Sequence, residues 1–279
     1  MQTRIVKLNF KKNQKFATVG ATSCWHIGNA RSRQDKIEAM LRRWKRAKTP
    51  WVNLGDTIDG IYRTDKRYHC ETTTVSILAQ IERVAELSKI AKDTMIGTII
   101  GNHDNTISGE IGCCIKHMLH QVYDHSNAEQ KYLGATAMVD FQCPEGMCRG
   151  LFAHGRIVCN SNTSDPVRDR ANDKVKLQRK LQNFLADFKI VGHGHKSIVV
   201  KPEPTKALTI GEDRKEKMVD MFLRPEWCAM SASMFASYGN EDYPSYAELA
   251  MYPPQDIGYL EIDIDRSGNV VNIREMLVD

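Results

Sequence analysis

The 279-residue sequence contains no run of about 18 consecutive apolar residues, so we expect no membrane-spanning helix and no membrane partner. Its first ten residues alternate polar and apolar side chains instead of placing a basic stretch before an apolar one. This pattern predicts a strand of the fold and no signal peptide. Internal repeats, low-complexity tracts and Pro/Gly/Ser-rich linkers are also missing, so a single domain over 1–279 is the simplest division.

Eight cysteines are present without an export signal, and we interpret them as reduced thiols of a cytoplasmic protein. Cys143 and Cys148 could form half of a zinc site, but no second pair has matching spacing, and a hairpin tip is the preferred interpretation. The content of 42% hydrophobic and 26% charged residues excludes disorder of the whole chain. The net charge of +5 suits a polyanionic partner but does not require one.

Apolar residues at regular spacing divide the region of about 16–196 into alternating strands and helices. We expect strands at 16–22, 51–54, 95–100, 151–153 and 190–191. A first helical stripe consists of Ile37, Met40, Leu41 and Trp44, and a second of Ile77, Ile81, Val84 and Ala85. A third predicted stripe joins Leu177, Leu181, Phe184, Leu185 and Phe188.

The part from about 197 to 279 is predicted to be mostly β. Its clearest signal is the alternation of apolar and acidic residues over 259–265, followed by a turn at 266–269 and a second strand at 270–273. A series of βα units followed by antiparallel strands predicts an α/β fold with two packed sheets and helices outside them. Ligands of such sheets gather at the carboxyl ends of the strands.

Five expected strands are followed by residue types that bind metals. The motifs are Ser-Cys-Trp-His at 23–26, Gly-Asp-Thr-Ile-Asp-Gly at 55–60, Gly-Asn-His-Asp at 101–104, Ala-His-Gly at 153–155 and Gly-His-Gly-His at 192–195. Glycine flanks nearly all of them, as expected where the backbone turns sharply beside a metal or a phosphate. Each gap between motifs exceeds the dozen or so residues that a crossover connection needs, so all five loops can share one rim.

In this order the motifs resemble those of the calcineurin-like metallophosphoesterase family, D-x-H, G-D-x-x-D, G-N-H-D/E, H and G-H-x-H. The resemblance implies a two-sheet sandwich flanked by helices, in four αββα layers, and two divalent metal ions. It implies one ion at His26 and His195, a second at Asn102, His154 and His193, and Asp56 as the bridge. His103 would lie over the substrate phosphate, oriented by Asp59.

The chemistry of these residue types agrees with that assignment. A carboxylate is the natural bridge between two cations, and two ions about 3.5–4 Å apart activate a hydroxide and stabilise the leaving oxygen of a phosphate ester. His103, which is not needed as a ligand, remains free to donate a proton or a hydrogen bond. We interpret the neighbouring Asp104 as a loop anchor and not as a catalyst.

The first motif departs from the family because Cys24 stands where an aspartate is expected. The expected ions are manganese, zinc or iron, and Cys24 could bind as a thiolate and bias the first site towards zinc or ferrous iron over magnesium. Alternatively, the enzyme works with one firmly held metal, or the chain is an inactive relative that keeps the scaffold for binding. The retention of the other expected ligands favours an active enzyme.

Gly60 follows Asp59 in the second motif and Asp104 follows His103 in the third, where protein phosphatases typically have Arg and Glu. The pattern is more similar to the phosphodiesterase and nuclease branch, which favours a nuclease-like hydrolase of DNA, RNA or nucleotides over a phosphomonoesterase. Two basic clusters give weak support. One comprises Arg42, Arg43, Lys45, Arg46 and Lys48, and the other Arg168, Arg170, Lys174, Lys176, Arg179 and Lys180. Asp165, Asp169 and Asp173 dilute the second cluster, for which a solvated helix face is the simpler account.

Overall fold

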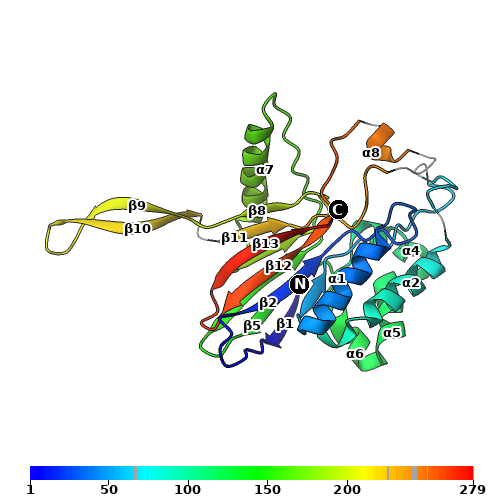
Figure 1. The fold of residues 1–279 in the computed structure, drawn as a ribbon, viewed down its shortest axis with the longest axis horizontal. Coiled ribbons are helices and arrows are strands. Elements are labelled where there is room, and N and C mark those ends of the chain that lie inside the picture. Colours follow the sequence, from blue (N-terminus) through cyan, green and yellow to red (C-terminus); the bar gives the residue numbers. More distant parts are fainter. Residues whose placement is uncertain (66–67, 74, 225, 240–243, 250, 279) are drawn as a thin grey trace.

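The computed structural model describes residues 1–65, 68–73, 75–224, 226–239, 244–249 and 251–278. The chain is an α/β protein, as predicted: two β-sheets face each other and helices cover both outer faces (Figure 1). The layers follow the order helix, sheet, sheet, helix. Strands of the C-terminal part lie inside both sheets, between or beside strands of the motif-bearing part.

The five-stranded sheet carries the first three motifs and has the order β13-β12-β2-β3-β4. Its strands are β2 (Phe16–Thr22), β3 (Trp51–Asn53), β4 (Met95–Thr98), β12 (Gly258–Asp265) and β13 (Val270–Leu277). β2, β3 and β4 are parallel, so the loops after them leave from the same edge. β12 and β13 form the predicted hairpin, and β12 pairs antiparallel with β2.

The six-stranded sheet carries the last two motifs and has the order β1-β5-β6-β7-β11-β8. Its strands are β1 (Gln2–Lys7), β5 (Thr136–Gln142), β6 (Met147–Ala153), β7 (Phe188–Val191), β8 (Ile198–Val200) and β11 (Trp227–Met230). The N-terminal segment is a strand, as predicted, at the edge of this sheet. The hairpin tip between β5 and β6 contains Cys143, whose N–H donates to the Gly146 carbonyl.

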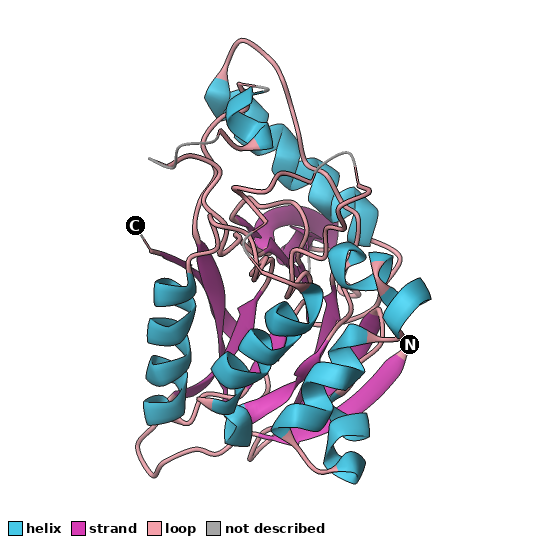
Figure 2. Cartoon of the chain, turned by 90° about the vertical axis from the view of Figure 1, so that its right-hand side faces the viewer, coloured by secondary structure: helices cyan, strands magenta, loops and turns pink. Residues whose placement is uncertain are grey.

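The main core lies between the sheets, where side chains such as Val19, Val52, Phe152 and Leu260 are completely buried. Helices α1 (Gln34–Ala47), α2 (Ile77–Lys89), α5 (Cys114–Val122) and α6 (His125–Lys131) cover the outer face of the five-stranded sheet (Figure 2). Helix α7 (Pro166–Leu181) covers part of the six-stranded sheet by packing on β8 and β11. Burial of apolar side chains on both faces of each sheet fixes the layers.

Helix α1 illustrates how the sequence pattern becomes packing. All four residues of its predicted stripe are buried. The Trp44 ring lies directly on β2 at Gly20, where an added Cβ would come within 2.5 Å of the ring. Lys48 ends the helix in the left-handed conformation, with a φ of 56°. Glycine at position 20 therefore lets the helix approach the strand that leads to the first motif.

The third predicted stripe is wrong beyond Leu181, where α7 ends. Phe184 and Leu185 follow the helix with 40% and 80% of their surface exposed, and Phe188 begins β7. Phe188 pairs with Gly150 in the parallel β6–β7 ladder. Sheet pairing across distant sequence overrides the local helical spacing at this point.

The remaining elements are η1 (Lys92–Thr94), α3 (Asn102–Thr106), α4 (Ser108–Ile111), α8 (Tyr246–Leu249), β9 (Glu203–Ile210) and β10 (Glu216–Arg224). β9 and β10 form a two-stranded ribbon that projects from the body (Figure 1). Across the part of the chain that the structure describes, no helix has the length and apolarity to cross a bilayer.

Candidate metal centre

The five motifs converge at one rim, and their backbone is unusual there. Eight non-glycine residues have positive φ among the described residues, and five of them belong to the predicted ligands. These five are Cys24, His26, Asp56, His193 and His195, with φ values of 53°, 46°, 52°, 68° and 53°. Left-handed backbone costs about 1–3 kcal/mol at a residue with a side chain, and such strain gathers at functional sites. The fold is therefore locally destabilised by the backbone conformations that place these side chains.

One group of predicted ligands, which we name the Asp56 cluster, comprises Asp56, Asn102, His154 and His193. The His154 Nε2 lies 3.0 Å from the Asp56 Oδ2 and 3.0 Å from the Asn102 Oδ1. The other ring nitrogen of His154, Nδ1, donates to the Leu54 carbonyl at 2.8 Å. The His193 ring lies edge-on to the His154 ring, with 5.2 Å between the centroids. Loops of both sheets therefore meet at this cluster.

The other group, the His26 cluster, comprises Cys24, His26 and His195. The Nε2 atoms of His26 and His195 face each other at 3.2 Å. The Cys24 Sγ belongs to one group of potential ligand atoms with these two histidines and to another with Asp56 and His154, each within 4.8 Å of one another. Cys24 thus lies where the two clusters join.

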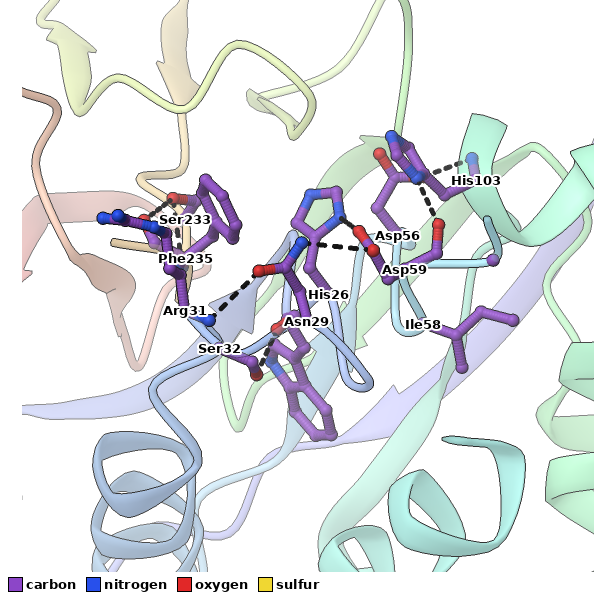
Figure 3. A network of polar contacts seen from close by, with 12 residues as sticks. His26, Asn29, Arg31, Ser32, Asp56, Ile58, Asp59, His103, Ser233 and Phe235 are labelled. Atoms are coloured by element: carbon purple, nitrogen blue, oxygen red, sulfur yellow. Dashed lines mark hydrogen bonds and ion pairs between the residues drawn. The ribbon is translucent and has the colours of Figure 1, made fainter. Parts of the chain in front are cut away.

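His103 and Asp59 lie beside the clusters, and their contact differs in detail from the expectation. The His103 Nδ1 donates to the main-chain carbonyl of Asp59 at 2.6 Å. The Asp59 carboxylate instead approaches the His26 Nδ1 at 3.5 Å and accepts from the Asn29 Nδ2 at 3.2 Å (Figure 3). Asp59 can therefore orient His103 through its backbone and His26 through its side chain.

Asp104 is placed as a loop anchor, the role that the sequence suggested for it. Its buried carboxylate accepts the N–H groups of Asp56 at 2.8 Å, Thr57 at 3.0 Å and Gly101 at 2.9 Å. Burial and the nearby Asp56 raise the pKa of Asp104. One carboxylate thereby ties the second motif to the third and fixes the backbone of Asp56.

Burial and mutual repulsion control protonation of the imidazoles. Burial lowers the pKa of His103, His193 and His195, and neighbouring histidines lower each of them further. Burial also opposes charge on His26, but hydrogen bonds with Asp59 and Cys24 raise its pKa to about 10. Burial alone would raise the pKa of Asp56, whereas the His154 contact holds it well below its usual range. Neutral imidazoles beside an ionised carboxylate are the forms that bind a cation.

The hydrogen-bond pattern of His154 fits a cation. Because Nδ1–H donates to Leu54, Nε2 is the ring atom that faces the Asp56 oxygen, and without a proton it presents a lone pair to that oxygen. Two such acceptors attract each other only through a shared proton or cation. Ligands bound about 2.1 Å from one cation lie about 3.0–3.4 Å apart. The separations of 3.0 Å in the Asp56 cluster and 3.2 Å between His26 and His195 match that range.

The His26 cluster contains a buried nitrogen without a hydrogen-bond partner in the part of the chain that the structure describes. The His195 Nδ1 is buried and has no hydrogen-bond partner among the described residues. Burial raises the pKa of the Cys24 thiol, so a thiolate at this position requires a neighbouring cation. Nitrogen, sulfur and carboxylate donors together suit borderline divalent ions such as zinc and ferrous iron.

Phe235 is a site residue that sequence reasoning missed. Its ring lies 5.4 Å from the His26 ring and 6.0 Å from the His195 ring, measured between centroids. In Figure 3 the His26 ring lies between Phe235 and Asp59. The N–H of the preceding Met234 donates to the Cys24 carbonyl at 3.0 Å. No motif marks this contact, because position 235 meets the first motif only through the tertiary fold.

A buried ion pair also lies in the surroundings of the His26 cluster. Arg31, with 2% of its surface exposed, donates to the Glu248 carboxylate at 2.7 Å and thereby joins the loop after the first motif to α8. The Asn29 side chain in the same loop contacts Asp59. The His26 cluster is thus enclosed by a loop and a C-terminal segment that carry none of the predicted ligands.

No protein-family model and no curated protein matches the sequence. Solved structures with a related arrangement include a predicted phosphoesterase from Streptococcus pneumoniae, with 11% identity, a TM-score of 0.37 and coverage of 94% of this chain and 98% of that chain. A Vps29 double mutant from Entamoeba histolytica has 11% identity, a TM-score of 0.38 and coverage of 95% and 99%. GAP50 of Plasmodium has 11% identity, a TM-score of 0.43 and coverage of 95% and 90%. Likenesses at this level do not determine function, so the functional proposal depends on the geometry of the site.

Proposed function

We propose that this protein is a metal-dependent phosphoric ester hydrolase of the calcineurin-like metallophosphoesterase type, and that it cleaves phosphodiesters of nucleic acids or nucleotides. The observation that carries the proposal is the buried meeting of the His154 Nε2 with the Asp56 carboxylate at 3.0 Å, beside the facing nitrogens of His26 and His195. Imidazole and carboxylate atoms at this spacing can hold cations once the metal has displaced the protons of the imidazoles. The order of the five motifs along the chain is the reason for proposing this family.

Two divalent ions, of manganese, zinc or iron, are proposed as cofactors. His26, His195 and Cys24 would hold one, Asn102, His154 and His193 the other, and Asp56 both. Such a pair supplies a hydroxide at neutral pH and neutralises charge on the phosphate. His154 donates through Nδ1–H to Leu54, which fixes the ring with its Nε2 directed at the site.

His103 is the proposed proton donor. Its Nδ1–H is held by the Asp59 carbonyl, so the second ring nitrogen, Nε2, is the atom left for the substrate. When protonated, Nε2–H can donate to the leaving oxygen, and when neutral it can accept a proton. The N–H of His103 also donates to the Asp56 Oδ1 at 2.8 Å, so this residue is fixed relative to the proposed bridging carboxylate.

Cys24 decides among three versions of the proposal. The placement of its Sγ in both groups of ligand atoms supports direct binding as a thiolate. A thiol that remains protonated would leave one firmly held ion. Loss of turnover would leave a binding scaffold, and the replacement of the family aspartate is the specific observation that favours this second function. All eight cysteines are unpaired, which is compatible with a cytoplasmic setting.

Metal analysis and ester hydrolysis test the proposal together. We expect the purified protein to contain divalent metal and to cleave bis(p-nitrophenyl) phosphate faster than p-nitrophenyl phosphate when supplied with manganese, zinc, iron or magnesium. Chelation and Asp56→Asn should each abolish this activity, because chelation removes the ions and the substitution removes the proposed bridging carboxylate.

The other outcomes are equally informative. Faster cleavage of the monoester would assign a phosphomonoesterase. Full metal occupancy without hydrolysis of either ester would overturn the enzymatic proposal in favour of the scaffold.

A further inference from the structure

Helix α7 lies next to the proposed metal centre although it carries none of the predicted ligands. The loop of 155–165 leads directly from His154 to this helix. Asp173, in the middle of α7, accepts from the Lys196 Nζ at 3.2 Å and from the Ser161 Oγ at 2.7 Å. Lys196 directly follows His195, so a single ion pair connects α7 to a proposed ligand loop.

The structure changes the interpretation of the charges on α7, because the three acidic residues are engaged with the first turn of the helix or with the adjoining loops. Asp165 caps the helix by accepting the Val167 N–H at 2.9 Å. Asp169 accepts the Thr163 N–H at 2.7 Å, and Asp173 makes the contacts described above. None of these carboxylates pairs with a cation of the helix itself within the described part of the chain.

The cations of α7 are correspondingly left without acidic partners. Lys176 donates to the Asn160 carbonyl at 2.8 Å. The other five, for which the described residues provide no ion pair, are Arg168, Arg170, Lys174, Arg179 and Lys180. In the α1 cluster, Arg42 and Arg43 are paired with Glu38 and Glu261, whereas Lys45, Arg46 and Lys48 also have no ion pair among the described residues. An unpaired basic helix is a suitable electrostatic surface for a polyanion.

Arg156 lies in the loop that connects His154 to helix α7. It follows His154 by two residues, after Gly155 turns the chain with a φ of 70°. Its side chain is exposed and has no hydrogen bond or ion pair among the described residues. The adjacent Ile157 carbonyl approaches Gly194, between His193 and His195: a Cβ added there would lie 3.4 Å from it. Arg156 is thus a free cation beside the proposed ligands.

We propose that Arg156 and the exposed face of α7 bind the sugar–phosphate backbone of a single nucleic-acid strand and lead it to the metal centre. This inference rests on the proposed function and narrows its substrates from nucleic acids or nucleotides to polynucleotides. Arg168 and Arg179 are eleven residues apart, which places them on one face of the helix about 16 Å apart. That face is turned away from Leu177, which is buried against the sheet. The spacing allows contact with phosphates separated along one strand.

Salt-dependent binding of an oligonucleotide tests the inference. The holoenzyme is titrated with fluorescent phosphorothioate oligo(dT) and oligo(U) of about 20 nucleotides, which resist hydrolysis, from about 50 to 200 mM salt. We expect Arg168→Gln/Arg179→Gln to reduce the slope of log K against log salt by about 1.4, and Arg156→Gln by about 0.7. The oligo(dT) and oligo(U) arms distinguish DNA from RNA.

Lys45→Gln/Arg46→Gln is the matched control, because it removes the same charge from the last turn of α1, at the end of the helix away from the first motif. It should leave the slope unchanged. The ratio of kcat/KM for an unmodified oligonucleotide to that for bis(p-nitrophenyl) phosphate should fall only in the α7 and Arg156 variants.

Two results would overturn the inference. One is an equal slope for wild type and α7 variants together with normal diester hydrolysis, which leaves the proposed function intact. The other is α7-dependent binding to anionic lipid vesicles without oligonucleotide binding. Conversely, oligonucleotide binding that depends on α7 in a protein that cleaves no ester would retain this inference and reject the proposed function.

Discussion

The Asp56 cluster and the His26 cluster differ in how far the protein alone completes them. In the Asp56 cluster, His154 contacts Asp56, Asn102 and the Leu54 carbonyl at 2.8–3.0 Å. In the His26 cluster, two imidazole nitrogens face each other and the His195 Nδ1 lacks a partner among the described residues. The first is largely preorganised, whereas the second leaves this buried ring nitrogen unsatisfied. Occupancy of the two proposed metal positions should therefore respond differently to mutation.

The largest effect should come from adding one methyl group beside the Asp56 cluster. In Gly101→Ala the new Cβ would lie 2.1 Å from the Asp56 Oδ1 and 2.2 Å from its backbone nitrogen. Neither group can yield without breaking the loop that Asp104 anchors, so we expect diester hydrolysis to fall by at least about 100-fold. Gly109→Ala is the control, because no atom lies within 4 Å of its Cβ. Similar activities of the two variants would show that the cluster is not tightly packed.

The residues of both clusters and several elements of the fold could be predicted from sequence patterns, but the difference between the clusters could not. Strand-end motifs identified every proposed ligand, since parallel strands bring their carboxyl ends to one edge. Burial periodicity likewise predicted α1, because the side chains of a helix face repeat at fixed spacing. The roles of these ligands stay predictions until metal is measured.

Features that depend on contacts between distant segments were not predictable. Phe235 lies beside His26 because the preceding strand, β11, pairs with β7 in the six-stranded sheet. Phe188 fits a helical stripe but forms a strand, because its partner, Gly150, lies far away in sequence. The engagement of Asp169 and Asp173 with adjoining loops is also a tertiary effect, and together with the capping role of Asp165 it reverses the interpretation of the α7 charges.

Removal of one histidine from each cluster sharpens the comparison in the metal-free protein. His154→Ala leaves the buried Asp56 carboxylate and the Leu54 carbonyl without their imidazole partner. We expect its free energy of unfolding to fall by about 1–3 kcal/mol more than that of His195→Ala. Urea unfolding after chelation measures this difference. Equal losses would mean that both clusters are equally dependent on metal.

Substitution of Cys24 tests the chemistry of the His26 cluster. Cys24→Asp replaces a soft sulfur ligand by a hard oxygen, so the ratio of manganese-supported to zinc-supported hydrolysis should rise, by about tenfold. The Cys24→Ser variant, which keeps the size of the side chain, should bind zinc more weakly without this gain. If neither substitution alters metal preference, Cys24 is not a ligand, and a single ion held at the Asp56 cluster becomes the better description.

The smallest effect should come from a change at Phe235, which lies against the His26 cluster. Phe235→Leu removes the ring that lies against both His26 and His195 and leaves every proposed ligand in place. Freer imidazoles lose orientation, so one of the two bound ions should be released at a higher free metal concentration, by no more than about the 10-fold that hydrogen-bonded outer partners contribute to metal affinity. Competition with a chelating dye measures this, and Phe184→Leu, in the turn before β7, serves as control. If both ions are lost together, the two clusters bind metal as one unit and their difference in preorganisation has no consequence for occupancy.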